Sequence, residues 1–244
     1  MSPMVLGYGP KPVCYLFRRA FGCATCPGMN IEGDYGKDGY ALIRQMIPRE
    51  VAQAFLWLLK RRKLPDGIVP AVPDGLDLGV LKRNVYELYS GDFPPMKTFL
   101  WGLTPVMQQV ARRRIVPTYA YFRIYRDGDL CHVHRDREAC EHSMSLTLAY
   151  SDGRPWPLEL GREGAGGPQD IIAEDFGPEL VSSLAMEVGD AVAYQGVDYR
   201  HGRTTPNPNR WSAHLFLHWV ERDGQFRDQA FDQRPPAPVD FQFS

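Results

Sequence analysis

The chain has 244 residues and a mass of 27.7 kDa, with 28 lysines and arginines against 29 aspartates and glutamates, for a formal net charge of −1. This balance argues against a protein that binds nucleic acid by neutralising phosphates, and it gives no basis for binding to a membrane surface. The content of 23 glycines and 21 prolines indicates many turns between short strands and argues against a helical bundle. The length is typical of one β-rich domain, so we expect residues 1–244 to form a single domain.

The hydropathy and cysteine content predict a cytoplasmic protein. The longest strongly apolar run, Ala54–Leu59, is far shorter than the ~20 residues that a membrane span requires, and residues 1–12 lack a signal pattern. An odd number of cysteines favours reduced thiols over a disulfide framework. Cys23 and Cys26, with Cys14 nearby, could begin a zinc site, but a fourth ligand is missing and we favour plain thiols.

The first half of the chain is expected to be mainly helical. Residues 1–38 read as an irregular N-terminal wrap, and residues 39–116 as a helical support that begins with a short strand at 40–44. One helix is predicted to begin at Pro48 and to end in the basic run 60–63. A second is predicted to begin at Thr104–Pro105 and to end in the basic run 112–114. In both helices the cations complement the helix dipole, so neither run predicts nucleic-acid binding.

From Thr118 onward the pattern changes to the period of two residues that is typical of strands. Residues 117–222 are therefore expected to form the β core, and residues 223–244 a C-terminal arm. The segment 151–187 is rich in glycine and proline and is a candidate lid. The predicted strands are 118–126, 130–136, 143–150, 191–194 and 211–221, with two short ones at 158–160 and 180–186.

The sharpest motif is His134-Arg135-Asp136. In a strand, residues two apart point to the same side, so the imidazole and the carboxylate converge while Arg135 points away. His201 follows another predicted strand and could supply a third ligand. Two histidines and one carboxylate form the facial triad of non-haem Fe(II) oxygenases.

A second motif, Arg210-Trp211-Ser212, begins nine residues after His201. Arg210 and Ser212 are expected to share a strand face, where a guanidinium beside a hydroxyl suits a carboxylate ligand. Upstream, Tyr125 and Gly128 lie nine and six residues before His134.

In this order, Tyr-x-x-Gly, His-x-Asp, His and Arg, the chain resembles the Fe(II)/2-oxoglutarate-dependent dioxygenases, in particular the prolyl-4-hydroxylase-like branch, from about residue 39 to residue 220. The resemblance implies a double-stranded β-helix (jelly-roll) core with N-terminal helices packed on its outside. It further implies Fe(II) bound by His134, Asp136 and His201. It also implies 2-oxoglutarate bound through Arg210, Ser212 and Tyr125.

The implied activity is that of a dioxygenase that uses O2 and 2-oxoglutarate to hydroxylate an unactivated C–H bond, with release of succinate and CO2. Related halogenases lack the carboxylate ligand, so the presence of Asp136 favours hydroxylation. Two alternatives stay open: a cupin-type metal-dependent hydrolase or isomerase, and a non-catalytic jelly-roll binding module. Neither has a use for the arginine–serine pair that follows the triad.

Other polar residues of the core carry weaker expectations. His214 and His218 share the strand face of Ser212 and could line the interior near the co-substrate. The substrate is expected to be a small molecule, an amino acid or a peptidyl group. We expect it to carry an anion, held by Arg203 or Arg123, because each shares a strand face with a predicted site residue. No oligomeric state is predicted.

Overall fold

The computed structural model describes residues 29–61, 69–70, 80–81, 85–164 and 172–233. The chain divides by contacts into two units, Met1–Asn30 and Ile31–Ser244, and almost all of the described residues belong to the second. The predicted wrap over residues 1–28, with Cys14, Cys23 and Cys26, lies outside the described residues, as does the end of the predicted C-terminal arm. No helix in the described part of the chain is long and apolar enough to cross a membrane.

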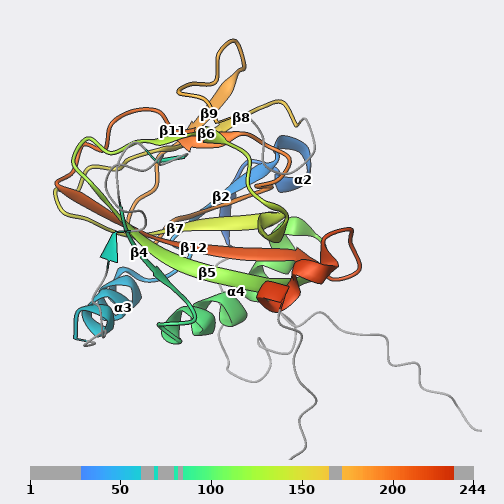
Figure 1. Cartoon of the computed structure of the whole chain (residues 1–244), viewed down its shortest axis with the longest axis horizontal. Coiled ribbons are helices and arrows are strands. Elements are labelled where there is room, and N and C mark those ends of the chain that lie inside the picture. The colour runs from blue at the N-terminus through green and yellow to red at the C-terminus, as the bar shows by residue number, and fades with distance from the viewer. Residues whose placement is uncertain (1–28, 62–68, 71–79, 82–84, 165–171, 234–244) are drawn as a thin grey trace, which may run out of the picture. The chain divides into compact units, whose positions relative to one another are not determined.

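The second unit is built on two antiparallel sheets (Figure 1). The large sheet has eight strands in the order β1-β2-β10-β7-β12-β5-β4-β3, and the small sheet has four in the order β6-β11-β8-β9. The strands are β1 (Asn30–Glu32), β2 (Tyr40–Arg44), β3 (Val69–Pro70), β4 (Tyr86–Tyr89), β5 (Ile115–Arg126), β6 (Cys131–His134), β7 (His142–Tyr150), β8 (Leu158–Gly161), β9 (Val181–Leu184), β10 (Ala191–Tyr194), β11 (His201–Arg203) and β12 (Trp211–Glu221). The helices are α2 (Tyr35–Asp38), α3 (Arg49–Arg61) and α4 (Pro95–Ala111), with 3-10 turns η1 (Glu138–Cys140) and η2 (Arg227–Gln233).

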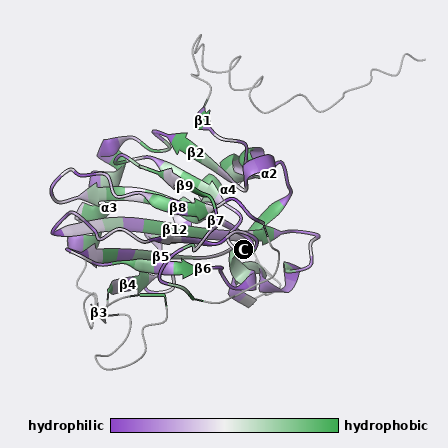
Figure 2. Cartoon of the chain, turned by 90° about the horizontal axis from the view of Figure 1, so that it is seen from above, coloured by the Kyte–Doolittle hydropathy of each residue, from purple (hydrophilic) through white to green (hydrophobic). Residues whose placement is uncertain are grey.

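The two faces of the large sheet differ in the side chains that they carry. On β5, the alternating residues Ala120, Phe122 and Ile124 face α3 and α4 and belong to the main hydrophobic core. Their neighbours Arg123 and Tyr125 face the other way, toward the small sheet. The same alternation runs along β12 and β7, so the main apolar core lies on the side of the helices, while polar side chains and two smaller apolar clusters face the small sheet. Figure 1 shows α3 and α4 on one side of the large sheet and the small sheet on the other. Figure 2 shows that the turns at the strand ends are mostly hydrophilic.

α4 begins earlier than the sequence predicts. Pro95 occupies its first turn, and Pro105, which we expected to open the helix, lies inside it. A proline at that position leaves a helical carbonyl without its usual donor. The neighbouring Thr104 connects this turn of the helix to β12, since its hydroxyl donates to Leu100 O (2.7 Å) and accepts from Trp219 Nε1 (2.9 Å). The segment 39–116 also contains β2, β3 and β4, so it is only partly helical.

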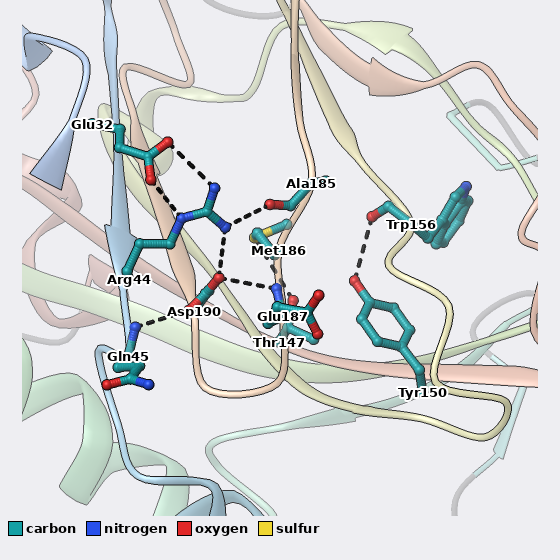
Figure 3. A network of polar contacts seen from close by, with 10 residues as sticks. All are labelled: Glu32, Arg44, Gln45, Thr147, Tyr150, Trp156, Ala185, Met186, Glu187 and Asp190. Carbon is teal, nitrogen blue, oxygen red and sulfur yellow. Dashed lines mark hydrogen bonds and ion pairs between the residues drawn. The ribbon is translucent and has the colours of Figure 1, made fainter. Parts of the chain in front are cut away.

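A polar network fixes β2 to the turn before β10 (Figure 3). The Asp190 carboxylate is 2% exposed and accepts from Arg44 Nη1 (2.9 Å) and from the backbone amides of Gln45 (2.8 Å) and Glu187 (3.0 Å). Gln45 has a positive φ of 50°, a conformation that a non-glycine residue adopts at a cost. The carboxylate therefore provides the acceptor that the two turn amides need, and it holds the edge of the large sheet in register.

Candidate metal centre and interior anion site

The structure brings His134, Asp136 and His201 together. His134 ends β6, His201 begins the adjacent strand β11, and the two are paired across the ladder. His134 Nε2 lies 3.6 Å from Asp136 Oδ1, and His201 Nε2 lies 3.5 Å from Asp136 Oδ2. One ligand atom from each residue can lie within 4.8 Å of the others, which is the spacing that a single metal ion requires.

The two imidazoles present the correct nitrogen. His134 Nδ1 lies 2.7 Å from the carbonyl oxygen of His132, and His201 Nδ1 lies 3.1 Å from that of Tyr199. A carbonyl only accepts, so each Nδ1 carries a proton and each Nε2, which lies beside the carboxylate, is the nitrogen available to a metal. This is the usual arrangement around histidine ligands, and the residues therefore fit a divalent metal.

Electrostatics favours a charged carboxylate at this site. Burial alone would raise the pKa of Asp136, but the imidazoles of His201 and His134 lower it well below its usual value. Burial and the neighbouring His201 lower the pKa of His134, while Asp136 outweighs burial and raises that of His201. Asp136 is thus an anion at neutral pH.

Two further residues shape this cluster, and sequence reasoning missed both. Ser143 Oγ lies 3.3 Å from Asp136 Oδ2 and 2.9 Å from His218 Nδ1. Gly196 passes so close that a Cβ there would lie 2.4 Å from Asp136 Oδ2 and 2.7 Å from Cys140 O. Gly196 stands in a loop without a motif, so no sequence signal could have found it.

A second polar group lies further along the interior. Arg203 of β11 is 1% exposed, its Nη1 donates to Trp156 O, and its guanidinium lies 4.6 Å from the Trp156 ring centroid. Arg123 of β5 forms an ion pair with Glu87. Burial lowers the pKa of His214 well below 6.5, and the charges of Arg203 and then Arg123 lower it further, so His214 is neutral.

Four buried polar atoms facing the interior have no hydrogen-bond partner in the part of the chain that the structure describes: Ser145 Oγ, Arg203 Nη2, His214 Nε2 and His218 Nε2. Buried polar atoms are rarely left in this state, because each costs about 1–3 kcal/mol. Such a group of unpaired atoms fits a polar ligand or water between the sheets.

The residues expected to bind 2-oxoglutarate are not all placed together. Tyr125 is 1% exposed and accepts a hydrogen bond from Arg123. The Ser212 hydroxyl is also buried but donates to Asn207 Oδ1 at 2.8 Å. Arg210 lies outside: its side chain is 77% exposed, and its Nε donates to Asp152 at 3.2 Å.

The placement of Arg210 has a local cause. Arg210 precedes β12, where its backbone amide donates to Asp152 Oδ2 (2.8 Å), so the alternation that orients Ser212 does not extend to it. Its side chain lines an outer groove between α3 and the large sheet, beside Leu56 and Leu59. The expectation that Arg210 and Ser212 share an inward face is therefore wrong for Arg210 in this structure.

Comparison with known proteins gives structural likeness without sequence likeness. No protein-family model matches the chain, and no curated protein matches it. A Pseudomonas putida prolyl-4-hydroxylase is 14% identical, with a TM-score of 0.56 over 78% of this chain and 96% of that one. The α-ketoglutarate-dependent carbocyclase SnoK from nogalamycin biosynthesis is 11% identical, with a TM-score of 0.62 over 82% of this chain and 88% of that one.

HygX from Streptomyces hygroscopicus, solved with nickel, 2-oxoglutarate and hygromycin B, is 12% identical, with a TM-score of 0.56 over 78% of this chain and 85% of that one. At such identities the likeness establishes the fold. The fold is that of the Fe(II)/2-oxoglutarate-dependent oxygenases, and the predicted double-stranded β-helix core is confirmed.

Proposed function

We propose that the protein is an Fe(II)- and 2-oxoglutarate-dependent dioxygenase that hydroxylates an unactivated C–H bond of its substrate. The observation that supports this most strongly is the cluster of His134, Asp136 and His201, in which two Nε2 atoms lie beside one carboxylate. These three residues would hold the metal, which with 2-oxoglutarate supplies the activation of O2. The carboxylate ligand favours hydroxylation over halogenation.

We place the distal carboxylate of 2-oxoglutarate on Arg203, with Tyr125 and His214 beside it. Arg203 Nη2 is buried without a partner among the described residues, whereas Arg210 is exposed and paired with Asp152. A buried guanidinium holds a carboxylate by charge-assisted hydrogen bonds, so it would orient the co-substrate along the interior. Ser212 would act on the site through Asn207 and Asn209.

The prime substrate that we propose is a small molecule, an amino acid or a peptidyl group. HygX was solved with hygromycin B bound, and SnoK comes from nogalamycin biosynthesis. Likeness to these two proteins favours a small molecule. An anionic group on the substrate stays a prediction. Arg123 could bind that group only by releasing its present partner, Glu87, while Arg203 would already hold the co-substrate. We also propose a cytoplasmic location, because Cys131 and Cys140 are free buried thiols.

The test is anaerobic addition of Fe(II) and 2-oxoglutarate to the metal-free protein. A metal-to-ligand charge-transfer band in the visible region is expected, and Asp136→Ala and His201→Ala should each lose it while the far-UV circular dichroism is retained. A panel of metabolites and amino acids, scored by succinate release above the uncoupled background, then finds the substrate.

Other outcomes would identify the alternatives. Folded protein that binds Zn²⁺ or Mn²⁺ at the triad but shows neither the band nor succinate release would favour a cupin-type hydrolase or isomerase. Folded protein that binds no metal there would favour a non-catalytic jelly-roll module. Wild-type-like turnover by His201→Ala would remove His201 from the site.

A further inference from the structure

A second group of metal-ligating side chains lies where β7 begins and β12 ends. Glu141 follows η1, His142 is the first residue of β7, and Glu221 is the last residue of β12. The two strands are paired antiparallel, with His142 opposite Trp219. One ligand atom from each of the three residues can lie within 4.8 Å of the others, and none of them belongs to the triad.

His142 points into this group with an unpaired nitrogen. The residue is 5% exposed, and its Nδ1 lies 2.7 Å from the Tyr35 hydroxyl oxygen. Its Nε2 is buried without a hydrogen-bond partner in the described part of the chain, at 4.0 Å from Glu221 Oε1. This distance is too long for a hydrogen bond but leaves room for an ion between the two atoms.

The imidazole is neutral, so it does not balance the carboxylate by itself. Burial, and then the charge of Arg113, lowers the pKa of His142 to about 4. The Tyr35 hydroxyl can accept from Nδ1–H, and in that tautomer the Nε2 lone pair is available to an ion beside Glu221. Tyr35 then has the role of the outer partner that orients a histidine ligand.

Negative charge accumulates around the group. Burial raises the pKa of Glu141, and the nearby carboxylates of Glu221 and Asp198 act in the same direction. Arg113 provides a positive charge beside these three acids, since its Nε lies 3.1 Å from Glu221 Oε1. The Arg113 side chain is 61% exposed and can turn into solvent, which would free the Glu221 oxygen for another cation.

We propose that Glu141, His142 and Glu221 form a second divalent-cation site, separate from the triad. One imidazole and two carboxylates suit Zn²⁺ or a similar first-row ion, with water completing the coordination. Glu141 keeps one oxygen for this role, since its other oxygen accepts from the backbone amide of Glu221 (2.7 Å). A bound ion would connect the start of β7 to the end of β12. This proposal does not depend on the proposed function.

The experiment counts Zn²⁺ ions on the full-length chain after chelator treatment, by competition with a chromophoric chelator. The parent is the Asp136→Ala/His201→Ala double variant, which removes the triad. Adding Glu221→Gln should lower the number of bound ions by one, and adding His142→Gln should do the same. Glu50→Gln, at an exposed position of α3, is the matched control and should leave the number unchanged.

Because each result is a difference from the same parent, ions bound elsewhere cancel. Far-UV circular dichroism of each variant establishes that the loss is not unfolding. As a second measurement, Co²⁺ should give a ligand-field spectrum in the parent that Glu221→Gln alters. Equal numbers of Zn²⁺ ions on the parent, Glu221→Gln and His142→Gln would overturn the proposal, whatever the triad does.

Discussion

The guanidinium of Arg123 donates a hydrogen bond to the phenol oxygen of Tyr125, with 2.8 Å between Nη1 and Oη. The same guanidinium pairs with Glu87 on the neighbouring strand β4, so its charge is already balanced. Arg203 reaches the same interior from the small sheet and contacts the Trp156 carbonyl and ring, with no carboxylate partner among the described residues. The two interior arginines therefore differ in what they can offer a ligand.

Arg203→Leu is expected to weaken 2-oxoglutarate binding by about 2–4 kcal/mol, the range for a lost charge-assisted contact that leaves a carboxylate unpaired. The dissociation constant follows from anaerobic titration of the charge-transfer band at saturating Fe(II). Arg210→Leu is the comparison, and it should bind 2-oxoglutarate nearly as the wild type does. If Arg210→Leu is the weaker binder of the two, the exposed arginine is the anchor and our assignment is wrong.

Gly196→Ala is expected to weaken Fe(II) binding although Gly196 is not a ligand. The added Cβ would lie 2.4 Å from Asp136 Oδ2 and must displace the carboxylate. A loss of about 10–100-fold in metal affinity is typical when ligand orientation is disturbed. Gly102→Ala, in α4 with no atom within 4 Å of the new Cβ, is the control and should leave affinity unchanged. An unchanged affinity in Gly196→Ala would show that the carboxylate can move without consequence.

The metal-free protein should lose stability below pH 6.5 in part through His214. This histidine is neutral when folded, since its pKa is well below 6.5, but takes up a proton when the chain unfolds. The unfolded state then binds more protons, so the free energy of unfolding falls as the pH falls, by about 1.4 kcal/mol per pH unit for one such group. In urea melts, His214→Gln should lose about 2 kcal/mol less than wild type between pH 6.5 and pH 5. Parallel pH curves for the two proteins would show that His214 is protonated in the folded state.

Asp190→Ala is expected to destabilise the fold by about 2–4 kcal/mol, because it leaves two turn amides and the Arg44 guanidinium without their acceptor. The measurement is the free energy of unfolding in urea at neutral pH. Glu32→Ala removes only the exposed partner of Arg44 and should cost much less than Asp190→Ala, because an exposed ion pair contributes little to stability. Similar losses in both variants would mean that the exposed pair, and not the turn, carries the network.

The sequence predicted the strands best where one face is buried throughout. The ranges 40–44, 191–194 and 211–221 coincide with β2, β10 and β12, because short runs rich in apolar residues are flanked there by turn residues. The start of α4 was missed because a proline is typical of the first helical position, whereas Pro105 lies inside the helix.

In the site, His134 and Asp136 could be grouped from the period of two alone, while His201 was a candidate third ligand from its place after a predicted strand, and the family resemblance supported that role. The outward position of Arg210 depends on Asp152, which lies 58 residues away in the sequence. The pattern of neighbouring residues cannot predict such a long-range contact. The pairing of Arg123 with Glu87 and the close approach of Gly196 likewise arise only from the folded topology.

Along β5, β7 and β12, residues that face the helices alternate with residues that face the interior, and this separation determines which positions can change during evolution. The side chains that hold the sheet to α3 and α4, such as Phe122 and Leu215, are different residues from those that face a ligand. Interior positions such as Ser145 and His214 carry unpaired polar atoms and lie outside the main core that packs on α3 and α4, so selection could replace them while that core stays fixed. New specificities would then be accessible by exchanging alternate residues along three strands, without redesign of the hydrophobic core.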